Sequence, residues 1–370
     1  MNKLLIIRIN DVAIKLTEMD PERKHWNTVV IGGGQSGLAT GYFLKKLNNE
    51  FVILDENEKP GTSWRRRWDS LKLFTPSHHD NLPGMSIPGG RGSLPSKDDM
   101  ADYLENYTSQ FSLPLQSNVK VNSLVSNNNH FEIESSAGTF TADRVVVATG
   151  THPFPYIPAV SRELSTDIYQ IHSSSYINPE LLPEGDVLVV GAGISGVEIA
   201  LEVAKTHKTY ISGKPTFHLP NLLLKYFGEL WWLVVNNVLT TNTPVGRKAR
   251  SRVLHGGGPL VNVSAEELEK EGINMYPRVT GSEEGMPQFS DGSSLKVSTI
   301  IWATGFKPDF SWIKMKVTDE TGWPVTKRGV SSYYNNLYFV GMPFQYGLTS
   351  GLVGGVGRDA EYISKQISLS

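Results

Sequence analysis

Residues 27–37 read NTVVIGGGQSG, and this stretch decides the fold. A run of β-branched apolar residues is followed by Gly32, Gly34 and Gly37 and then by the helix-like LATGYFLKKL. The pattern predicts a strand, a tight turn and a helix. In such a unit the first glycine permits the turn, the second lets the backbone approach a diphosphate, and the third packs the helix against the strand. The stretch therefore predicts a dinucleotide-binding loop.

The same pattern recurs at residues 186–196, which read DVLVVGAGISG and are followed by VEIALEVAK. Here the three glycines are Gly191, Gly193 and Gly196. A single G-x-G-x-x-G is weak evidence, because glycine turns between strand and helix also serve packing alone. Two copies in the same context are much harder to attribute to packing. Each copy predicts one bound dinucleotide.

The two copies differ at the tip of the second strand, which meets the adenosine ribose about 20 residues after the first glycine. In the first copy, Asp55 in EFVILDE lies 23 residues after Gly32. In the second, Lys214 in TYISGK lies 23 residues after Gly191. A carboxylate suits a free ribose, as in FAD, whereas an ammonium beside the hydroxyl of Ser212 suits the 2′-phosphate of NADP(H). The alternative is that Lys214 is a solvated loop lysine.

A second pair of similar stretches supports the duplication. DRVVVATG at 143–150 and STIIWATG at 298–305 are buried-type strands that stop at Ala-Thr-Gly. Each follows an expected hairpin, at 130–142 and at 288–297, and the latter carries the turn signal Asp291-Gly292. We interpret the two Ala-Thr-Gly stretches as the points where each module closes.

These patterns predict an α/β protein with two Rossmann-like dinucleotide-binding domains, in which the NADP domain is inserted into a discontinuous FAD domain. The proline-rich THPFPYIP and the later GFKPDF are the expected linkers, and a final helix is expected to begin at Thr349 or Ser350. The expected limits are 19–158 with 306–370 for FAD, 159–305 for NADP(H), an apolar helical insertion at about 215–263, and a non-core extension at 1–18. The insertion is either a packing helix or a lid for an apolar substrate.

The composition narrows the classes of partner. The chain carries 35 basic and 37 acidic residues, for a formal net charge of −2, so neither nucleic acid nor an anionic membrane is expected. The most apolar stretch, LWWLVVNNVL, is shorter than the ~20 residues of a membrane-spanning helix, and no secretory leader is evident. We expect a cytoplasmic protein whose partners are a small-molecule substrate and O2, and we leave a homodimer open.

Cysteine is absent, which removes disulfide scaffolds, thiolate metal sites, cysteine nucleophiles and any dithiol relay beside a flavin. The pair His78-His79 has no carboxylate at ligand spacing, so no metal is expected. FAD and NADPH together support hydride transfer from NADPH to FAD. The single lysine Lys214 does not forbid the use of NADH.

Several stretches together resemble the flavin-containing monooxygenases, most closely their short bacterial members, from about residue 27 onward. They are VVIGGGQSG, PGTSWRRRWDSLKLFTP, LPGMSIPG, LVVGAGISGVEIA, IIWATGFKPDF and GRDAEY. The resemblance implies an FAD-dependent, NADPH-using monooxygenase. In that family a flavin hydroperoxide, protected by bound NADP+, passes one oxygen atom to sulfur or nitrogen, in sulfide S-oxidation or amine N-oxidation.

The resemblance also implies ligands for both cofactors, by motif position. The residues expected at FAD are Gly32, Gly34, Ser36, Gly37, Asp55, Trp64 and Thr149. Those expected at NADP(H) are Gly191, Gly193, Ser195, Gly196, Ser212 and Lys214. Further expected cofactor neighbours are Gln35, Glu56, Val121, Ala148, Gly150, Ala303, Thr304, Gly305 and Gly341.

Two features of the chain depart from the family pattern. The fingerprint F-x-G-x-x-x-H-x-x-x-Y/F is present only as His172 and Tyr176, with Thr166 and Ile168 at its Phe and Gly positions. Larger members also carry an asparagine near the flavin where this chain has Phe74 in LKLFTP. We expect Phe74, Thr75 and Tyr346 to face the flavin.

Two other readings remain open. One is an FAD/NADPH electron-transfer reductase or NADPH oxidase, which would use the same cofactors without inserting oxygen. The other is a redox-sensing module that regulates a partner through cofactor occupancy.

Overall fold

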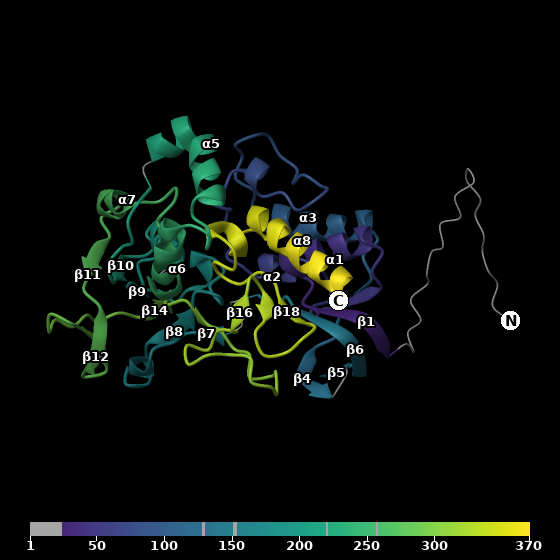
Figure 1. Cartoon of the computed structure of the whole chain (residues 1–370). Helices are drawn as coiled ribbons and strands as arrows, with labels where there is room; N and C mark the ends of the chain where they lie inside the picture. The colour runs from purple at the N-terminus through teal and green to yellow at the C-terminus, as the bar shows by residue number, and fades with distance from the viewer. Residues whose placement is uncertain (1–23, 128–129, 151–153, 220, 257) are drawn as a thin grey trace.

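The computed structural model describes residues 24–127, 130–150, 154–219, 221–256 and 258–370 (Figure 1). The expected extension at 1–18 lies outside these residues. Two sheets organise the chain, each with helices packed against it: the first is mixed with a run of parallel strands, and the second is entirely parallel. The predicted α/β architecture with two dinucleotide-binding-type modules is confirmed.

The first sheet has nine strands, and its main path runs β16-β17-β18-β6-β1-β2-β3. The parallel strands β18, β6, β1, β2 and β3 form its centre, and β4 and β5 extend it as an antiparallel meander from β6. Its strands are β1 (His25–Ile31), β2 (Phe51–Leu54), β3 (Leu115–Gln116), β4 (Val121–Asn127), β5 (His130–Ser135), β6 (Gly138–Val147), β16 (Thr326–Lys327), β17 (Val330–Ser331) and β18 (Leu337–Phe339).

Three helices pack together on one face of this sheet: α1 (Gln35–Lys46), α3 (Lys97–Gln110) and α8 (Val353–Leu369) (Figure 1). The short α2 (Thr62–Arg65) contacts α3. Helix α3 begins with a capping box in which Ser96 and Asp99 exchange hydrogen bonds, so its first backbone donors are satisfied. The buried face of α8 lies against α1, which ties the C-terminal helix to the first glycine loop.

The second sheet has five parallel strands in the order β11-β10-β9-β14-β8. Every residue of β9, β10 and β14 is buried, as expected of parallel strands covered on both faces. The strands of this sheet are β8 (Tyr169–His172), β9 (Val187–Val190), β10 (Thr209–Ser212), β11 (Asn274–Tyr276) and β14 (Thr299–Trp302). The helices of this module are α4 (Ile194–Val203) and α7 (Ala265–Lys270). A separate hairpin pairs β12 (Val279–Glu283) with β13 (Met286–Phe289).

The second sheet is formed entirely by residues that lie between β6 and β16 in the sequence, so the first sheet is discontinuous along the chain. The two connections between the modules run side by side, because β7 (Phe154–Pro155) pairs antiparallel with β15 (Phe306–Lys307). The exact domain limits given above stay a prediction.

The hairpin expected at Asp291-Gly292 forms as a short pairing, in which the Phe289 amide donates to the Ser293 carbonyl at 2.8 Å and Gln288 bridges Ser294. A further hairpin, β12–β13, precedes it and turns at Glu284 and Gly285, both with positive φ. One local prediction needs correction. Helix α8 begins at Val353 instead of next to Thr349 or Ser350, because those two residues form the 3-10 turn η4 (Leu348–Gly351). In that turn the Ser350 hydroxyl accepts hydrogen bonds from the Tyr346 and Gly347 amides.

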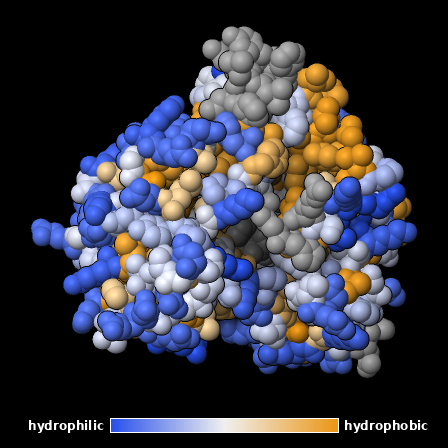
Figure 2. Space-filling view, turned by 90° about the vertical axis from the view of Figure 1, so that its left-hand side faces the viewer, coloured by the Kyte–Doolittle hydropathy of each residue, from blue (hydrophilic) through white to orange (hydrophobic). Residues whose placement is uncertain are grey.

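The expected insertion forms α5 (Asn221–Asn237) and α6 (Pro244–Gly256). Helix α5 stands at the top of the molecule in Figure 1, and apolar surface gathers at the same height in Figure 2. Leu230 and Leu233 contribute to it, each 59% exposed. No helix of the described residues has the length and apolar character to cross a membrane. The remaining 3-10 turns are η1 (Ser77–His79), η2 (Ala159–Arg162) and η3 (Pro179–Leu181).

Candidate functional site

The first glycine loop joins β1 to α1, and its three glycines have different surroundings. Gly32 has a φ of +107°, and a β-carbon there would lie 2.6 Å from the Ala148 carbonyl oxygen. A β-carbon at Gly37 would lie 1.8 Å from the Gly32 oxygen, so this glycine is needed for helix packing. At Gly34 an added β-carbon would meet no described atom within 4 Å. The middle glycine therefore borders open space, where a diphosphate would approach.

The second glycine loop, between β9 and α4, repeats this geometry. Gly191 has a φ of +112°, and its β-carbon would lie 2.3 Å from the Ala303 carbonyl oxygen. The β-carbon of Gly196 would lie 1.9 Å from the Gly191 oxygen, while that of Gly193 would meet none of the described atoms within 4 Å. The two loops thus offer the same kind of cradle, each at a helix N-terminus.

Asp55 sits at the end of β2 and is 9% exposed. Its Oδ2 accepts from the Gly33 amide at 2.5 Å, and its Oδ1 accepts from the amide and side chain of Asn57 at 2.8 and 2.9 Å. The carboxylate is therefore fixed beside the glycine loop, where a ribose would lie. The neighbouring Glu56 is exposed.

Lys214 follows β10 and is exposed at the corresponding tip of the second sheet. The Ser212 hydroxyl is buried and donates to the Pro277 carbonyl at 2.6 Å, and the Gly213 amide donates to the Tyr276 carbonyl at 3.0 Å. The Ser212 hydroxyl that was expected to assist Lys214, and the adjacent Gly213 amide, are thus engaged within the module. The side chain of Lys214, by contrast, is exposed to solvent.

The two Ala-Thr-Gly stretches follow β6 and β14 directly, and each lies against a glycine loop. Ala148 continues the pairing with β1 through its amide, and the Thr149 side chain is exposed. The Thr304 hydroxyl donates to the Tyr156 carbonyl, and Gly305 accepts from Nε2 of His172 at 3.0 Å. The second stretch is therefore tied to the connection between the modules.

The two surviving residues of the family fingerprint are both buried. His172 contacts Gly305 through Nε2 and receives the Ser174 amide at Nδ1, and burial lowers its pKa. A neutral imidazole with its proton on Nε2 satisfies both contacts. The Tyr176 hydroxyl donates to Glu202 of α4 at 2.9 Å.

Other expected FAD neighbours gather around the N-terminus of α1. Trp64 Nε1 lies 3.4 Å from the Gln35 side-chain oxygen, and a β-carbon at Gly341 would lie 2.2 Å from the Ser36 hydroxyl. Gly341, which follows β18, therefore lies directly against the first glycine loop. Val121 begins β4 and packs against the core on the other face of the sheet, away from α1.

Phe74 and Thr75 lie in the loop before η1. Phe74 is half-buried, and its carbonyl accepts from the Asn262 side chain at 3.1 Å, which joins this loop to the second module. The buried Thr75 hydroxyl donates to Oδ1 of Asp80, a residue that is 1% exposed. Burial raises the pKa of Asp80 to about 7, and its Oδ2 has no hydrogen-bond partner in the described structure. Sequence reasoning missed Asp80; an acid between the two prolines Pro76 and Pro83 was the available signal.

The Tyr346 ring lies close to two arginines. The guanidinium carbons of Arg328 and Arg358 lie 4.2 and 4.4 Å from the centre of its ring, and its hydroxyl accepts from Asn242 at 3.3 Å. These contacts commit the ring to cationic neighbours and to the insertion. A flavin-facing role for Tyr346 stays a prediction.

The insertion is docked on the first module near these residues. The Asn236 side chain of α5 accepts from Thr349, and its carbonyl accepts from Arg358 at 2.7 Å. After α5, the Thr241 amide donates to the Tyr346 carbonyl at 2.8 Å. The segment that leaves the second module therefore closes over the C-terminal loop of the first.

The pair His78-His79 does acquire a carboxylate, contrary to the sequence argument. Glu229 of α5 lies 2.9 Å from His78 Nε2 and 3.9 Å from His79 Nε2. Arg91 approaches the same Glu229 oxygen at 2.7 Å, and Glu229 is exposed. A cation already pairs with this carboxylate, so we interpret the group as an ion-pair network that links α5 to the first module.

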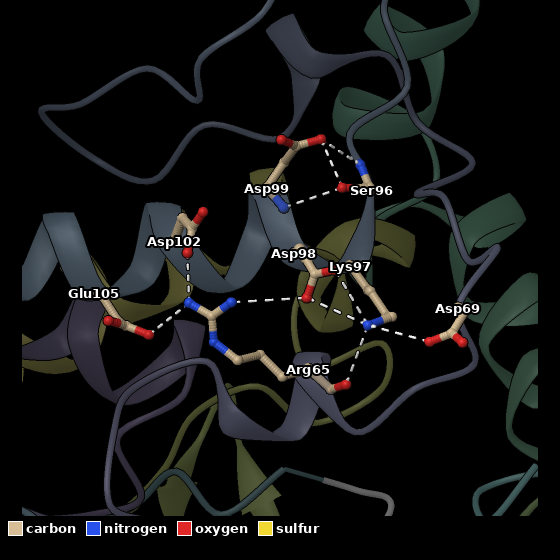
Figure 3. Close-up of polar contacts among 8 residues, drawn as sticks. All are labelled: Arg65, Asp69, Ser96, Lys97, Asp98, Asp99, Asp102 and Glu105. Carbon is tan, nitrogen blue, oxygen red and sulfur yellow. Dashed lines mark hydrogen bonds and ion pairs between the residues drawn. The ribbon is translucent and has the colours of Figure 1, made fainter. Parts of the chain in front are cut away.

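The basic stretch Arg65–Arg67 divides between two environments. Arg65 contacts Asp98, Asp102 and Glu105 of α3, at 2.5 to 3.7 Å (Figure 3). Arg67 is turned toward the junction of the modules, where its guanidinium lies 5.6 Å from the Phe306 ring and burial lowers its pKa. Arg65 is thus committed to α3 and is not available to a diphosphate.

The model of the pyridine nucleotide-disulphide oxidoreductase family matches residues 29–213. A relative from Geobacillus kaustophilus (strain HTA426), an uncharacterized oxidoreductase described as CzcO-like, is 40% identical over 346 residues, which is 92% of this chain and 98% of the relative. The chain belongs to the pyridine nucleotide-disulphide oxidoreductase family. Because this member has no cysteine, the dithiol chemistry in the family's name is not open to it.

Monooxygenases are also among the proteins similar to this oxidoreductase. The structure of a flavin-containing monooxygenase from Stenotrophomonas maltophilia matches with a TM-score of 0.77 and 26% identity, covering 94% of this chain and 99% of that one. The probable indole-3-pyruvate monooxygenase YUCCA8 of Arabidopsis thaliana is 27% identical over 80% of this chain and 81% of its own. The resemblance seen in the sequence is confirmed, and the chain is a flavoprotein oxidoreductase of the flavin monooxygenase type.

Proposed function

We propose that this protein uses FAD and NADPH to transfer one oxygen atom of O2 to the sulfur or nitrogen of a small soft nucleophile. The observation that carries the proposal is the pair of matching glycine loops, each with a middle glycine that borders open space. Two cradles with different strand-tip side chains, Asp55 and Lys214, fit two different dinucleotides. FAD, when bound, accepts hydride from NADPH and reacts with O2.

The residues of the chain bind and position the cofactors. Gly32, Gly34 and Gly37 would receive the FAD diphosphate at the N-terminus of α1, with Asp55 at the ribose. Gly191, Gly193 and Gly196 would receive the NADPH diphosphate at α4, with Lys214 at the 2′-phosphate. Trp64 and Gly341 would flank the FAD site, because both contact the first turn of α1.

A second candidate function is an NADPH oxidase or electron-transfer reductase with the same cofactors. Phe74 favours it, because a phenyl ring has no amide with which to hold an oxygenated flavin or NADP+. The two functions differ only in where the oxygen atoms of O2 go.

One experiment separates them. The FAD-loaded protein is reduced with NADPH without oxygen, and isotopically labelled O2 is then admitted together with thioanisole, a neutral thioether. Labelled sulfoxide formed in proportion to NADPH supports the monooxygenase. Hydrogen peroxide without sulfoxide would establish the oxidase instead. When benzylmethylamine replaces thioanisole, hydrogen peroxide without the N-hydroxylamine would lead to the same conclusion.

A further inference from the structure

A cavity of about 370 Å³ lies between α6, the β16–β17 hairpin and the loop 342–346. This volume falls within the range of small-molecule sites. Its described lining contains no carboxylate, but it contains three basic and three aromatic side chains: Arg250, Lys327, Arg328, Trp323, Tyr346 and Tyr362. The lining thus combines positive charge with aromatic surface.

Arg328 is held in a specific orientation within this lining. Its guanidinium carbon lies 4.2 Å from the Tyr346 ring centre and 4.0 Å from that of Tyr362. The described residues provide no hydrogen-bond acceptor for its Nε. Stacking on aromatic rings leaves the edge of a guanidinium, where its N–H groups lie, available for a planar anion. The arginine is therefore fixed in position with at least one donor, Nε, still to be satisfied.

The backbone at Arg328 is unusual for this residue type. Arg328 and Gly329 form the two-residue turn of the β16–β17 hairpin, with φ values of +53° and +87°. This geometry favours Asn-Gly, because a long side chain at positive φ is strained. Such an outlier is a reason to look for function. Gln345 lies tightly against the turn, since a β-carbon at Gly329 would lie 2.2 Å from its Nε2.

The cavity is also connected to the expected FAD site through a short loop. Met342, Pro343, Gln345 and Tyr346 line it, and they directly follow Gly341, which lies against Ser36 of the first glycine loop. In the same loop the buried Phe344 has a φ of +52°, so the backbone here is held in a strained form. A ligand in the cavity would therefore contact the loop that directly follows Gly341, beside the expected FAD site.

We propose that this cavity binds the carboxylate of an aromatic organic acid, with Arg328 as the bidentate partner. Arg250 and Lys327 add positive charge, and the tyrosine and tryptophan rings accommodate the aromatic part. If the proposed monooxygenase function holds, which this step assumes, the acid is the substrate and carries the sulfur or nitrogen that is oxidised.

The test uses (phenylthio)acetate and its uncharged analogue 2-(phenylthio)acetamide. Binding to the FAD-loaded protein is measured by calorimetry, which does not depend on turnover. We expect the acid to bind at least tenfold more tightly than the amide, and Arg328→Asn to abolish the difference. Arg328→Lys should keep only part of it, because an ammonium lacks the planar fork.

Arg328→Asn is a suitable variant because Asn-Gly is a favoured pair for this turn, so the fold should be at least as stable. Arg278→Asn removes an exposed arginine outside the cavity and should leave binding of the acid unchanged. Equal binding of acid and amide, or an unaltered preference in Arg328→Asn, would overturn the proposal. Displacement of the acid by equimolar inorganic phosphate would overturn the carboxylate assignment in favour of a phosphate site.

Failure of this proposal can be told apart from failure of the proposed function. Thioanisole carries no charge, so its oxygenation reports on the monooxygenase alone. Sulfoxide from thioanisole without any preference for the acid would contradict only the carboxylate site. Tight binding of the acid without sulfoxide from either thioether would support the site and contradict the monooxygenase.

Discussion

The backbone amide of Gly33 donates to the Oδ2 of Asp55 at 2.5 Å. This contact joins the first glycine loop to the tip of β2, so the diphosphate cradle and the residue expected at the ribose are held as one unit. No equivalent can form in the second module, where the matching position is Lys214 and a lysine side chain has no acceptor. The two loops are thus alike in backbone geometry and different in charge.

Replacing Asp55 with alanine should weaken FAD binding. The variant loses both the anchor of Gly33 and the acceptor for the ribose, and a hydrogen bond to a charged group contributes about 1.5–3 kcal/mol. We expect the Kd for FAD, measured by fluorescence quenching, to rise by about tenfold to a hundredfold. Glu58→Ala, an exposed acid in the same turn, serves as the control and should bind FAD normally. Normal FAD affinity in Asp55→Ala would remove Asp55 from the site.

Replacing Lys214 with alanine should affect NADPH selectively. The charge-assisted contact with the 2′-phosphate is worth about 1.5–3 kcal/mol, so the KM for NADPH should rise by about tenfold to a hundredfold. The KM for NADH should be nearly unchanged, because NADH lacks this phosphate. Lys208→Ala, at the other end of β10, is the matched control. Equal losses with both nucleotides would show that Lys214 does not recognise the phosphate.

Asp80 should make folding stability depend on pH. Its pKa in the folded protein is raised to about 7, mainly by burial, from an ordinary value of 3.8. The folded state therefore binds the proton more tightly, and this contribution to stability is complete below pH 3.8 and is lost as pH rises to about 7. Asp80→Asn should flatten the pH dependence of the unfolding midpoint in that window.

A second buried acid, Glu198 of α4, titrates in the same range, because burial and the nearby Glu202 raise its pKa to about 7. Glu198→Gln is therefore the comparison variant for Asp80→Asn. Each single variant should remove part of the slope, and the double variant should remove more than either. A slope in Asp80→Asn that equals the wild-type slope would show that Asp80 is ionised in the folded protein.

The contacts of Arg65 with α3 should contribute little to stability. Its side chain is 37% exposed, and exposed ion pairs contribute about 1 kcal/mol or less. Arg65→Gln should lower the free energy of unfolding by about that amount, and the loss should shrink in high salt. A loss well above this that persists in high salt would mean that the three carboxylates of α3 depend on Arg65 as a buried network does.

The glycine loops, their strands and helices, and the insertion of one module into the other follow from the sequence, because glycine spacing and β-branched runs are local signals. The start of α8 does not follow, since Ser350 has the composition of a helix cap but its hydroxyl is used inside η4. The turn at Asp291-Gly292 follows from its strong local signal, whereas the β12–β13 hairpin was not predicted, because its turn residues Glu284-Gly285 are a weaker signal.

Contacts between distant segments were not readable from the sequence. Ser212 has the right residue type for a phosphate ligand, yet its hydroxyl is used by Pro277, 65 residues away. Glu229 reaches His78 across 151 residues. The grouping of Arg328 with the two tyrosines that orient it was not predicted, because they lie 18 and 34 positions further along the chain. Such groupings depend on how loops pack between the modules, for which composition and periodicity give no signal.

The central claim is that two like-built loops hold different dinucleotides, and the middle glycines test it most directly. Both have extended backbone angles and open space at the β-carbon, so Gly34→Ala and Gly193→Ala should fold normally. The measurement is flavin content together with the rate of flavin reduction by NADPH in each variant. We predict that Gly34→Ala loses FAD, whereas Gly193→Ala keeps FAD but is reduced far more slowly. Full flavin content and normal reduction in both variants, or loss of FAD only in Gly193→Ala, would contradict the claim.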